Sequence, residues 1–307
     1  MDITTLINGD PLKTEPYICQ HVDNAEGRCD TLWVEFIDTD NELRALDLVK
    51  GAEVQAFHGA LDTGIVYVSE IRYSGRKVAL KALSTPPGLK RASSASWDNI
   101  SFTELVQTVA AETGLTLKLL NAIDVRYETV TRFNMPPIQF LQSRLELESF
   151  CCKVRDNTLI AYDERIQERK DYVQQLHDTD FESDPEYSTS DAELAAACIN
   201  AYQTPALDYI RTVVESGLDG QTISQNIAVY SIGESERYCK GFLRKANKYE
   251  YVATGDIKGG AYEAGQNVYL VDAPEGHAGL NYIYRVTSDF VNDIQTLEMR
   301  RPIKGDY

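Results

Sequence analysis

Short runs in which every second residue is apolar, each closed by turn residues, set the strongest limit on how this chain folds. In 31–37 the residues Leu32, Val34 and Phe36 alternate with polar neighbours, and 78–82 repeats the pattern. Such alternation places the apolar side chains on one face of a strand. Together with β-rich runs and turn sequences that follow at regular spacing, it indicates a small barrel or sandwich over residues 1–85. The β-rich runs lie at 53–57 and 64–73, and the turns at 24–27, 38–41, 59–64 and 74–75.

A different pattern begins after this segment. The stretch 84–88, Ser-Thr-Pro-Pro-Gly, is hard for any regular element to cross and marks a first boundary. Ser101 and Glu104 then have the spacing of a capping box, and Gly114 stands where the helix should end. These signals predict a helix between them. Its expected buried stripe is Phe102, Leu105, Val106, Val109 and Ala110.

A second helix is predicted after a strand at 124–130. Two prolines, Pro136 and Pro137, precede it, and the first turn of a helix tolerates proline. The buried stripe is expected to consist of Ile138, Leu141 and Leu145.

A β-hairpin is predicted next, because β-rich runs at 150–154 and 158–162 flank the turn residues 155–157. The vicinal pair Cys151 and Cys152 lies in its first strand. Since successive side chains of a strand point to opposite faces, we expect one thiol to face inward and the other outward. The block from 86 to 185 is therefore predicted to be mixed α+β.

The segment 163–186 is polar and acidic, and we interpret it as a solvated connector and a second boundary. Its cluster 178–186 suggests calcium, but it lacks the central Gly and the closing Glu of an EF-hand loop.

The final third, 186–307, mixes the two kinds of pattern. Helices are expected at 190–202, where Ser190 and Glu193 have capping-box spacing, and at 235–247. A second barrel with a helix across it is the economical interpretation. Its strands are expected at 209–214, 249–254, 267–271, 282–288 and 295–300.

Charge and composition exclude several classes of protein. The chain has 30 Lys and Arg against 47 Asp and Glu, a net charge of −17 that is spread over all three segments. Such acidity repels nucleic acid and anionic membranes and argues against a role in binding DNA, although solubility alone also explains the acidity.

No apolar run is long enough for a membrane span, and residues 1–11 do not resemble a secretory signal. We therefore expect synthesis in a cytosol.

The six cysteines are too few and too scattered for a disulfide scaffold, and we expect free thiols. A Cys19–Cys29 bridge, formed once the protein is outside the cell, stays a hypothesis.

A search for catalytic chemistry yields no candidate. Ser235 misses the GxSxG pattern by its last residue, and the glycines of 255–260 fit neither phosphate-binding pattern and are explained by a hairpin turn. Carboxylates are abundant, but nothing singles out a pair. We therefore expect no enzyme activity and no catalytic, cofactor-binding or metal-binding residues. No metal or triad spacing relates the four histidines, His21, His58, His177 and His277.

Several stretches resemble one known family. Residues 29–36, Cys-Asp-Thr-Leu-Trp-Val-Glu-Phe, resemble a strand of its first barrel, with Gly51 and Gly64 at the entrances of later strands. The stretch 89–115 is similar to its first helix and the residues ahead of it. The family is that of the tail hub proteins of the phage late control gene D type.

The most specific similarity to this family covers 135–154, with Asp156 and 159–162, and corresponds to the family's helix and hairpin. Ser149 stands where the family usually has Gly. The last barrel matches loosely through 264–265 and 284–288 and lacks a His that often follows.

The resemblance implies a mainly β, α+β fold with two small tube-like β-barrel domains, at 1–85 and at 186–307, separated by a mixed α+β domain at 86–185. It implies a structural protein of a tail baseplate, assembled in the cytoplasm of a bacterial host, in a phage or a tailocin. Three copies would form a ring around a central channel and adapt a hexameric tail tube to a trimeric spike. The implied partners are two further copies of the chain, tail tube or tube-initiator proteins, the central spike protein, baseplate wedge proteins and, as a further candidate, the tape measure protein, with no membrane and with DNA only as passing cargo.

Two alternatives belong to other classes of protein. A tail-associated cell-wall hydrolase is disfavoured because the chain ends at 305–307, directly after the last expected strand, which leaves no room for a lytic domain. A tail-tip protein that binds carbohydrate or a receptor could use the 18 tyrosines, but Trp33 and Trp97 lie far apart in sequence and are expected to pack in cores.

Overall fold

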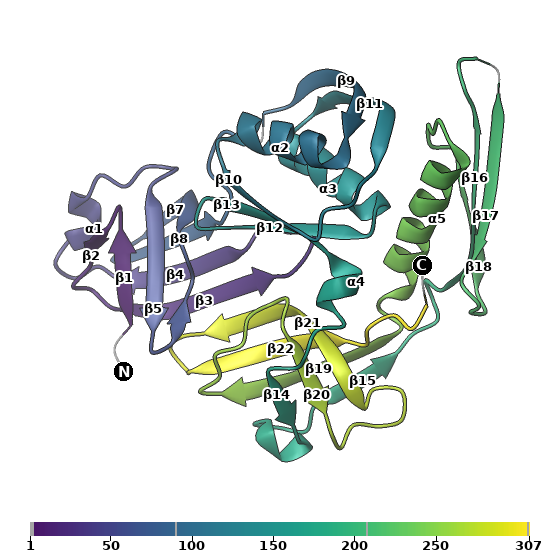
Figure 1. The fold of residues 1–307 in the computed structure, drawn as a ribbon. Coiled ribbons are helices and arrows are strands. Elements are labelled where there is room, and N and C mark those ends of the chain that lie inside the picture. Colours follow the sequence, from purple (N-terminus) through teal and green to yellow (C-terminus); the bar gives the residue numbers. More distant parts are fainter. Residues whose placement is uncertain (1–2, 90, 207, 306) are drawn as a thin grey trace.

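The computed structural model describes residues 3–89, 91–206, 208–305 and 307 (Figure 1). Lys90, within the stretch 89–115, and Asp306, near the chain end, lie outside it. The described chain forms four sheets, and the largest has fourteen strands. The first segment contributes α1 (Glu42–Ala45) and the strands β1 (Thr4–Ile7), β2 (Asp10–Pro11), β3 (Pro16–Asn24), β4 (Thr31–Ile37), β5 (Glu53–His58), β6 (Leu61–Asp62), β7 (Val66–Ser74) and β8 (Lys77–Leu83).

The last segment completes the same sheet. Its strands are β14 (Gln174–Leu176), β15 (Glu186–Thr189), β19 (Tyr251–Lys258), β20 (Asn267–Leu270), β21 (Gly279–Asp289) and β22 (Ile294–Arg300). Along the sheet the order is β15-β19-β22-β21-β3-β4-β8-β7-β5-β1-β2, so the two segments meet where β21 pairs antiparallel with β3.

This pairing corrects the expectation of two separate barrels, since none of the described sheets is closed. A barrel in the first segment would need the outer edge of β3 to pair with its own strands. That edge is instead used by β21, with Asn24 opposite Arg285 and Gln20 opposite Asp289. The same edge of β21 pairs with β20 nearer its start, through Gly279–Tyr282.

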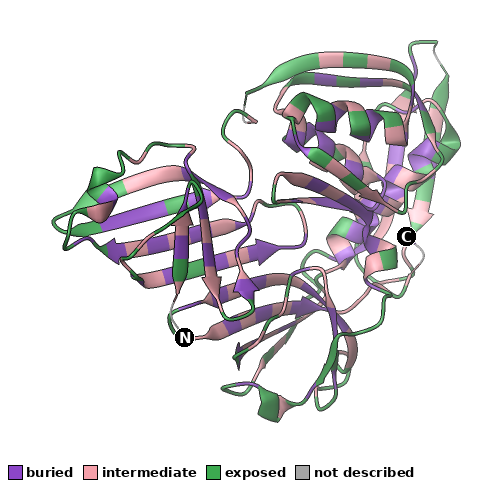
Figure 2. Ribbon diagram, turned by 60° about the vertical axis from the view of Figure 1, so that its left-hand side comes forward, coloured by how far each residue is buried: buried purple, intermediate pink, exposed green. Residues whose placement is uncertain are grey.

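The middle of the chain packs as a mixed unit around an apolar core that also includes Val229 and Tyr238. It contains β9 (Ser93–Ser101), α2 (Phe102–Thr113), β10 (Thr116–Leu120), β11 (Arg126–Met135), α3 (Pro137–Leu147), β12 (Phe150–Arg155), β13 (Thr158–Asp163) and α4 (Glu164–Gln167), followed by the 3-10 turn η1 (Asp178–Asp180). Figure 2 shows the strand that arches over α2, which is β9, as largely exposed, and its partner in the sheet is β11.

The predictions of helix α2 and of the β12–β13 hairpin are confirmed. The side chain of Ser101 accepts a hydrogen bond from the N–H of Glu104, whose carboxylate accepts from the N–H of Ser101, and Gly114 ends the helix at φ +72°. The five apolar residues of the predicted stripe are all buried. In the hairpin β12–β13 the turn residues Asp156 and Asn157 both have positive φ, as a two-residue hairpin turn requires.

The predicted helix at 190–202 is wrong. Its second half forms β16 (Ala195–Gln203), which lies between β17 (Tyr209–Glu215) and the parallel strand β18 (Gln221–Gln225). The Ala-rich run favours a helix locally, but pairing on both edges and packing against α5 (Ile232–Asn247) override that preference. Helix α5 itself is confirmed and begins slightly earlier than predicted, with Ser231 as its N-cap. No helix in the described ranges is long and apolar enough to cross a membrane.

The capping box generates a first prediction. Ser101→Ala removes the side-chain oxygen that accepts from Glu104 N–H, so we expect the free energy of unfolding to fall by about 1 kcal/mol. Urea denaturation measures this loss. The control is Ser183→Ala, at an exposed serine, which should leave the midpoint unchanged, and equal effects of the two substitutions would contradict the capping account.

Candidate functional site

A large group of buried charges gathers where the segments of the protein meet. Three carboxylates and three cations form one network, and the most exposed of the six side chains, that of Lys248, is only 12% exposed. The residues come from the turn after β3, from α4 and the residue after it, from α5 and its C-terminal cap, and from the end of β22. They are Glu26, Glu164, Glu168, Arg244, Lys248 and Arg300.

Glu164 lies at the centre of this charge network. One of its oxygens accepts from Arg300 Nη2 at 2.6 Å and lies 3.3 Å from Lys248 Nζ. The other accepts from Arg244 Nε at 2.7 Å. Glu168 forms ion pairs with both Arg244 and Arg300. One carboxylate thus binds cations from α5 and from β22, which joins the helix to the sheet.

Glu26 brings the first segment into the network. It pairs with Lys248, its Oε1 lies 3.6 Å from Arg300 Nε, and the same oxygen accepts from the hydroxyl of Tyr249 at 3.1 Å. The Arg300 guanidinium also lies 4.8 Å from the centre of the Tyr282 ring. The network therefore connects residues from the first, the middle and the last part of the chain.

The electrostatics keep most of these groups charged. Burial alone raises the pKa of Glu164, but Lys248, Arg300 and Arg244 hold that pKa well below its usual range. For Arg300 the effect of burial has the opposite sign and lowers the pKa. Glu168, Glu164 and Glu26 outweigh it and raise that pKa well above the ordinary value. Glu26 differs, because burial and the neighbouring Glu164 raise its pKa.

Cys151 lies against this network, with its thiol 3.7 Å from Glu26. Burial, helped by Glu164 and Glu26, raises its pKa well above the usual value, so the thiol stays protonated and is a poor nucleophile. Glu26, Cys151 and Glu164 bring three ligand-type atoms within 4.8 Å of one another. Because three cations already bind these carboxylates, the donor set favours an ion-pair network over a metal ion.

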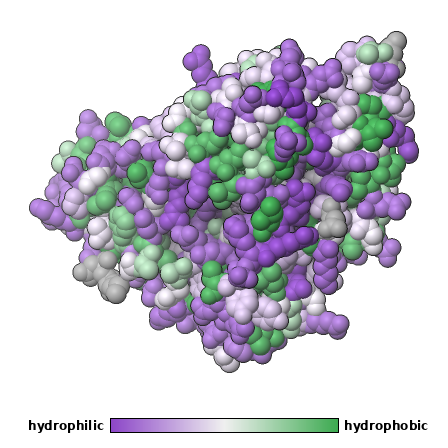
Figure 3. Space-filling model, viewed as in Figure 1, coloured by the Kyte–Doolittle hydropathy of each residue, from purple (hydrophilic) through white to green (hydrophobic). Residues whose placement is uncertain are grey.

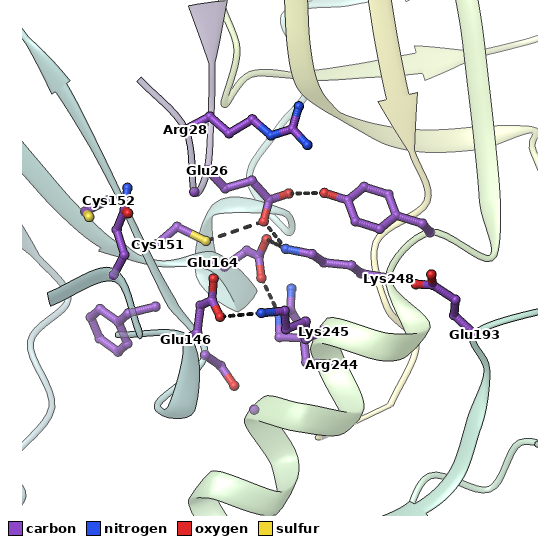
Figure 4. A pocket seen from close by; sticks show the side chains of 16 residues that line it. Glu26, Arg28, Glu146, Cys151, Cys152, Glu164, Glu193, Arg244, Lys245 and Lys248 are labelled. Carbon is purple, nitrogen blue, oxygen red and sulfur yellow. Dashed lines mark hydrogen bonds and ion pairs between the residues drawn. The ribbon is translucent and has the colours of Figure 1, made fainter. Parts of the chain in front are cut away.

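A hollow of about 370 Å³ opens beside the network (Figure 4). Its lining adds Arg28, Glu146, Glu193 and Lys245, and Lys245 pairs with Glu146 at 2.7 Å. Acidic and basic side chains alternate around it, so it selects neither anions nor cations. This hollow is better described as the solvent-facing side of the charge network than as a substrate site.

A second polar joint binds the hairpin β12–β13 to both neighbours. Lys153 Nζ donates to Asp23 at 2.7 Å, and the same carboxylate accepts from the N–H of Ala264 at 2.8 Å. At the hairpin tip, Asp156 accepts from the N–H of Ile65 at 2.8 Å, and Arg155 donates to Glu263 at 2.7 Å. The middle unit is thus held by the first and the last segments at once.

Two titratable groups near this joint have shifted pKa values. Burial, assisted by Asp23, raises the pKa of Asp30 to about 7, and its carboxylate accepts from the N–H of Asn24 at 2.9 Å. Burial lowers the pKa of His21 to about 4, against the opposing effect of Asp23. Both groups are therefore held neutral by the fold at mildly acidic pH.

The residues that the sequence suggested as possible catalytic or binding residues do not come together in one site. Ser235 is buried in α5, where its hydroxyl accepts from Asn200, which fits a structural role. His58 lies near Asp293, and His177 binds Asp272 at 2.8 Å. The glycines of 255–260 do not form the expected hairpin turn, since β19 pairs with β15 and β22 and not with the strand that follows it.

The connector and the cysteines require further corrections. Segment 163–186 is not only solvated, because Glu164 and Glu168 are 2% and 1% exposed. Their positions in a run of charged residues gave no signal of burial. Cys151 and Cys152 point to opposite sides of β12 but both are buried, because the charge network covers the side that was expected to face outward. All six cysteines, Cys19 and Cys29 included, are free thiols.

The outer surface is mostly hydrophilic on the face shown in Figure 3, with smaller apolar patches among the charged side chains. Both ends of the large sheet are open within the described chain, at β2 and at β15. Exposed strand edges and apolar side chains are features of protein contact surfaces. Among the described residues, the large apolar side chains that are more than half exposed are those of Val49, Tyr73, Phe133, Val173, Tyr209 and Ile232.

Comparison with known proteins gives no match to a protein-family model or to a curated protein. The fold is similar to that of the 43 kDa tail protein of prophage MuSo2 from Shewanella oneidensis, with a TM-score of 0.79 and 10% identity over 98% of this chain and 99% of that chain. It is also similar to the tail protein from Neisseria meningitidis MC58, with a TM-score of 0.76 and 10% identity over 98% of this chain and 96% of that chain.

A third similar structure is that of the E. coli c3393 protein, a component of the type VI secretion system with structural similarity to the T4 bacteriophage tail proteins gp27 and gp5. Its TM-score is 0.54 at 12% identity, over 96% of this chain and 76% of that chain. At these identities the likeness shows a shared fold.

The charge network generates a second prediction. Arg300→Met leaves Glu164 and Glu168 buried with one cation fewer, so we expect a loss of about 3 to 5 kcal/mol in the free energy of unfolding. The matched control is Arg72→Met, which breaks an exposed pair with Glu70 and should lower the free energy of unfolding far less. Denaturant titration of both variants measures the difference. Similar losses would show that the network does not hold the fold together.

A third prediction concerns pH. Because the folded state raises the pKa of Asp30 to about 7, the group's contribution to stability is fully present below its ordinary pKa and is lost as the pH rises through about 7. Asp30→Asn keeps an oxygen that can accept from Asn24 but never ionises. We therefore expect the variant to gain stability relative to the native chain between about pH 4 and pH 8. Denaturation across this range tests the idea, and a pH-independent difference would contradict it.

Proposed function

We propose that the chain is a structural, non-enzymatic hub of a phage-type tail baseplate. Three copies form a ring around a central channel and adapt a hexameric tail tube to a trimeric spike. The observation that carries this proposal is the extent of the fold likeness: two tail proteins match nearly their whole length and nearly all of this chain, at TM-scores of 0.79 and 0.76. The E. coli c3393 protein, with its own similarity to the T4 tail proteins gp27 and gp5, adds support.

The joints inside the chain support a structural role. The sheet continues from the first segment into the last through β3 and β21, and the charge network fixes α5 against that sheet. An adaptor between two assemblies has to keep its segments in a fixed relation, and these contacts provide that. The units 1–85, 86–185 and 186–307 belong to this proposal as the parts that the joints hold in place.

The open sheet ends support self-assembly. Identical chains that contact one another head to tail close into a ring when the rotation between them allows it. Each copy offers two different free edges, at β2 and at β15, within the described residues. Such edges invite pairing unless they are covered.

The net charge of −17 fits a channel through which DNA passes without binding. In this proposal DNA is cargo only, and the lumen is lined by acidic side chains. The protein partners are the tube or tube-initiator proteins, the spike, the wedge proteins and the tape measure protein, in a virion or tailocin assembled in the bacterial cytoplasm. The buried, protonated Cys151 and the buried Ser235 also fit a protein without a nucleophile.

The fourth prediction tests this proposal. Native mass spectrometry of the purified chain at micromolar concentration should show three copies per particle, and a spike protein should bind that particle and not single copies. A chain that stays monomeric at every concentration would contradict the ring.

Zymography on peptidoglycan tests the absence of enzyme activity, and a lytic band from the purified chain would overturn it.

A further inference from the structure

The outer face of the β7–β8 hairpin carries cations that are not paired. Val78 and Leu80 of β8 point into the core, so Lys77 and Lys81 at the alternate positions point outward, and both are exposed. Arg76, in the turn before them, is exposed too. Within the described ranges, no ion pair involves Arg76, Lys77 or Lys81.

The carboxylates on the same face already have partners. Glu35 accepts from the indole N–H of Trp33 at 3.1 Å, and Glu70 forms an ion pair with Arg72. Ile37 is 46% exposed beside these charges, at the end of β4, where it lies opposite the first residue of β8. We call the surface formed by Ile37, Arg72, Arg76, Lys77 and Lys81 the hairpin surface.

Another surface, on the last segment, is apolar at its centre. The ring centres of Tyr172 and Tyr269 lie 5.5 Å apart. Val173 precedes β14 and Val271 follows β20, and these two strands pair in parallel. All four side chains are between 36% and 55% exposed. Exposed apolar patches that contain tyrosine are typical of surfaces that another protein covers.

Acidic side chains flank this apolar patch. Asp272 lies 2.8 Å from Nδ1 of His177, and Asp180 accepts from the N–H of His177 at 2.7 Å, so both carboxylates lie beside the end of β14. The stretch 178–186 contains five carboxylates and no Lys or Arg. In the part of the chain that the structure describes, neither these five nor Asp272 pair with a lysine or an arginine. We call the surface formed by Tyr172, Val173, Tyr269, Val271, Asp180 and Asp272 the β14 surface.

The two surfaces lie in different parts of the molecule and have opposite charge. Figure 1 shows β7 and β8 on the left and β14 and β20 at the lower end. Copies of a chain with net charge −17 repel each other at a distance, so a contact between copies is favoured where the local charges are opposite. A contact between two different surfaces of identical chains runs head to tail, which is the arrangement that closes into a ring.

We propose that the hairpin surface of one copy binds the β14 surface of the next copy. In this contact Ile37 packs against the tyrosines, and Arg76 and Lys77 face Asp180 and Asp272. The first segment of one copy then meets the last segment of its neighbour, and these are the segments whose sheet ends, β2 and β15, are unpaired within the described chain. The contact rests on the three-copy ring proposed above and names the surfaces that hold it together.

The fifth prediction concerns charge reversal at either surface. Arg76→Glu with Lys77→Glu, or Asp180→Lys with Asp272→Lys, places like charges opposite each other in the contact. Each pair of substitutions should raise the concentration at which half of the chains form three-copy particles by about tenfold. Sedimentation equilibrium of the full chain measures that concentration, and circular dichroism checks that each variant is folded.

A chain that carries all four substitutions separates a broken contact from a damaged fold. Every copy then presents both reversed surfaces, so opposite charges meet again and assembly should return to within about threefold of the native concentration. The control is Lys118→Glu with Lys304→Glu, at two exposed lysines elsewhere. It changes the net charge as much as the hairpin pair does and should leave assembly unchanged within about threefold at physiological salt.

The apolar centre of the contact is tested separately from its charges. Tyr172→Ser removes apolar area that the neighbouring copy would cover, so it should also raise the assembly concentration by about tenfold. Tyr209→Ser, at an exposed tyrosine of β17, is the matched control and should not change it.

The outcomes distinguish this contact from the ring itself. If the native chain forms three copies and neither the charge reversals nor Tyr172→Ser alter assembly, the contact is wrong and the ring stands. The contact is also wrong if each reversal weakens assembly but the chain with all four substitutions does not recover. A native chain that stays monomeric overturns the ring and the contact with it.

Discussion

The buried pairing of Glu164 with Arg244, Lys248 and Arg300 is the interaction on which the arrangement of this protein depends. Isolated burial of any one of these charges would be prohibitive, but each is stabilised by partners from other parts of the chain. Glu26 joins the first segment, Arg244 and Lys248 join α5, and Arg300 joins the last strand of the large sheet. The network can therefore form only when distant segments have met.

Because of this dependence, the parts of the chain are held in one fixed arrangement. Each part of the chain has an apolar cluster, and each cluster also includes a residue from another part, such as Tyr238, Phe290 or Ala25. Polar contacts add to these in specifying how the parts are placed. The sheet crosses from one segment to the other at β3 and β21, and the hairpin β12–β13 is held by Asp23 and Glu263. The proposed adaptor role requires joints of this kind, and within the described residues the two ends of the large sheet stay unpaired.

Local signals in the sequence predicted local structure well. The capping box at Ser101, the stripe of α2 and the hairpin turn at Asp156 depend on neighbouring residues and are confirmed. The helix predicted at 190–202 is wrong, because β16 is formed by pairing with β17 and β18, which follow later in the chain. Glu164 and Arg300 gave no signal, since a buried ion pair between residues far apart in sequence looks like two surface charges. The open sheet could not be foreseen either, because the partner of β3 is about 260 residues away.

We propose that the two β segments of each chain are neighbouring parts of one three-copy ring. Electron cryo-microscopy of the purified particle, averaged along its axis, tests this most directly. We expect three-fold symmetry, an open channel, and six β layers around it, two from each chain, with α5 held by the charge network in every copy. Particles without a channel, or rings in which only one of the two β segments faces the axis, would contradict it.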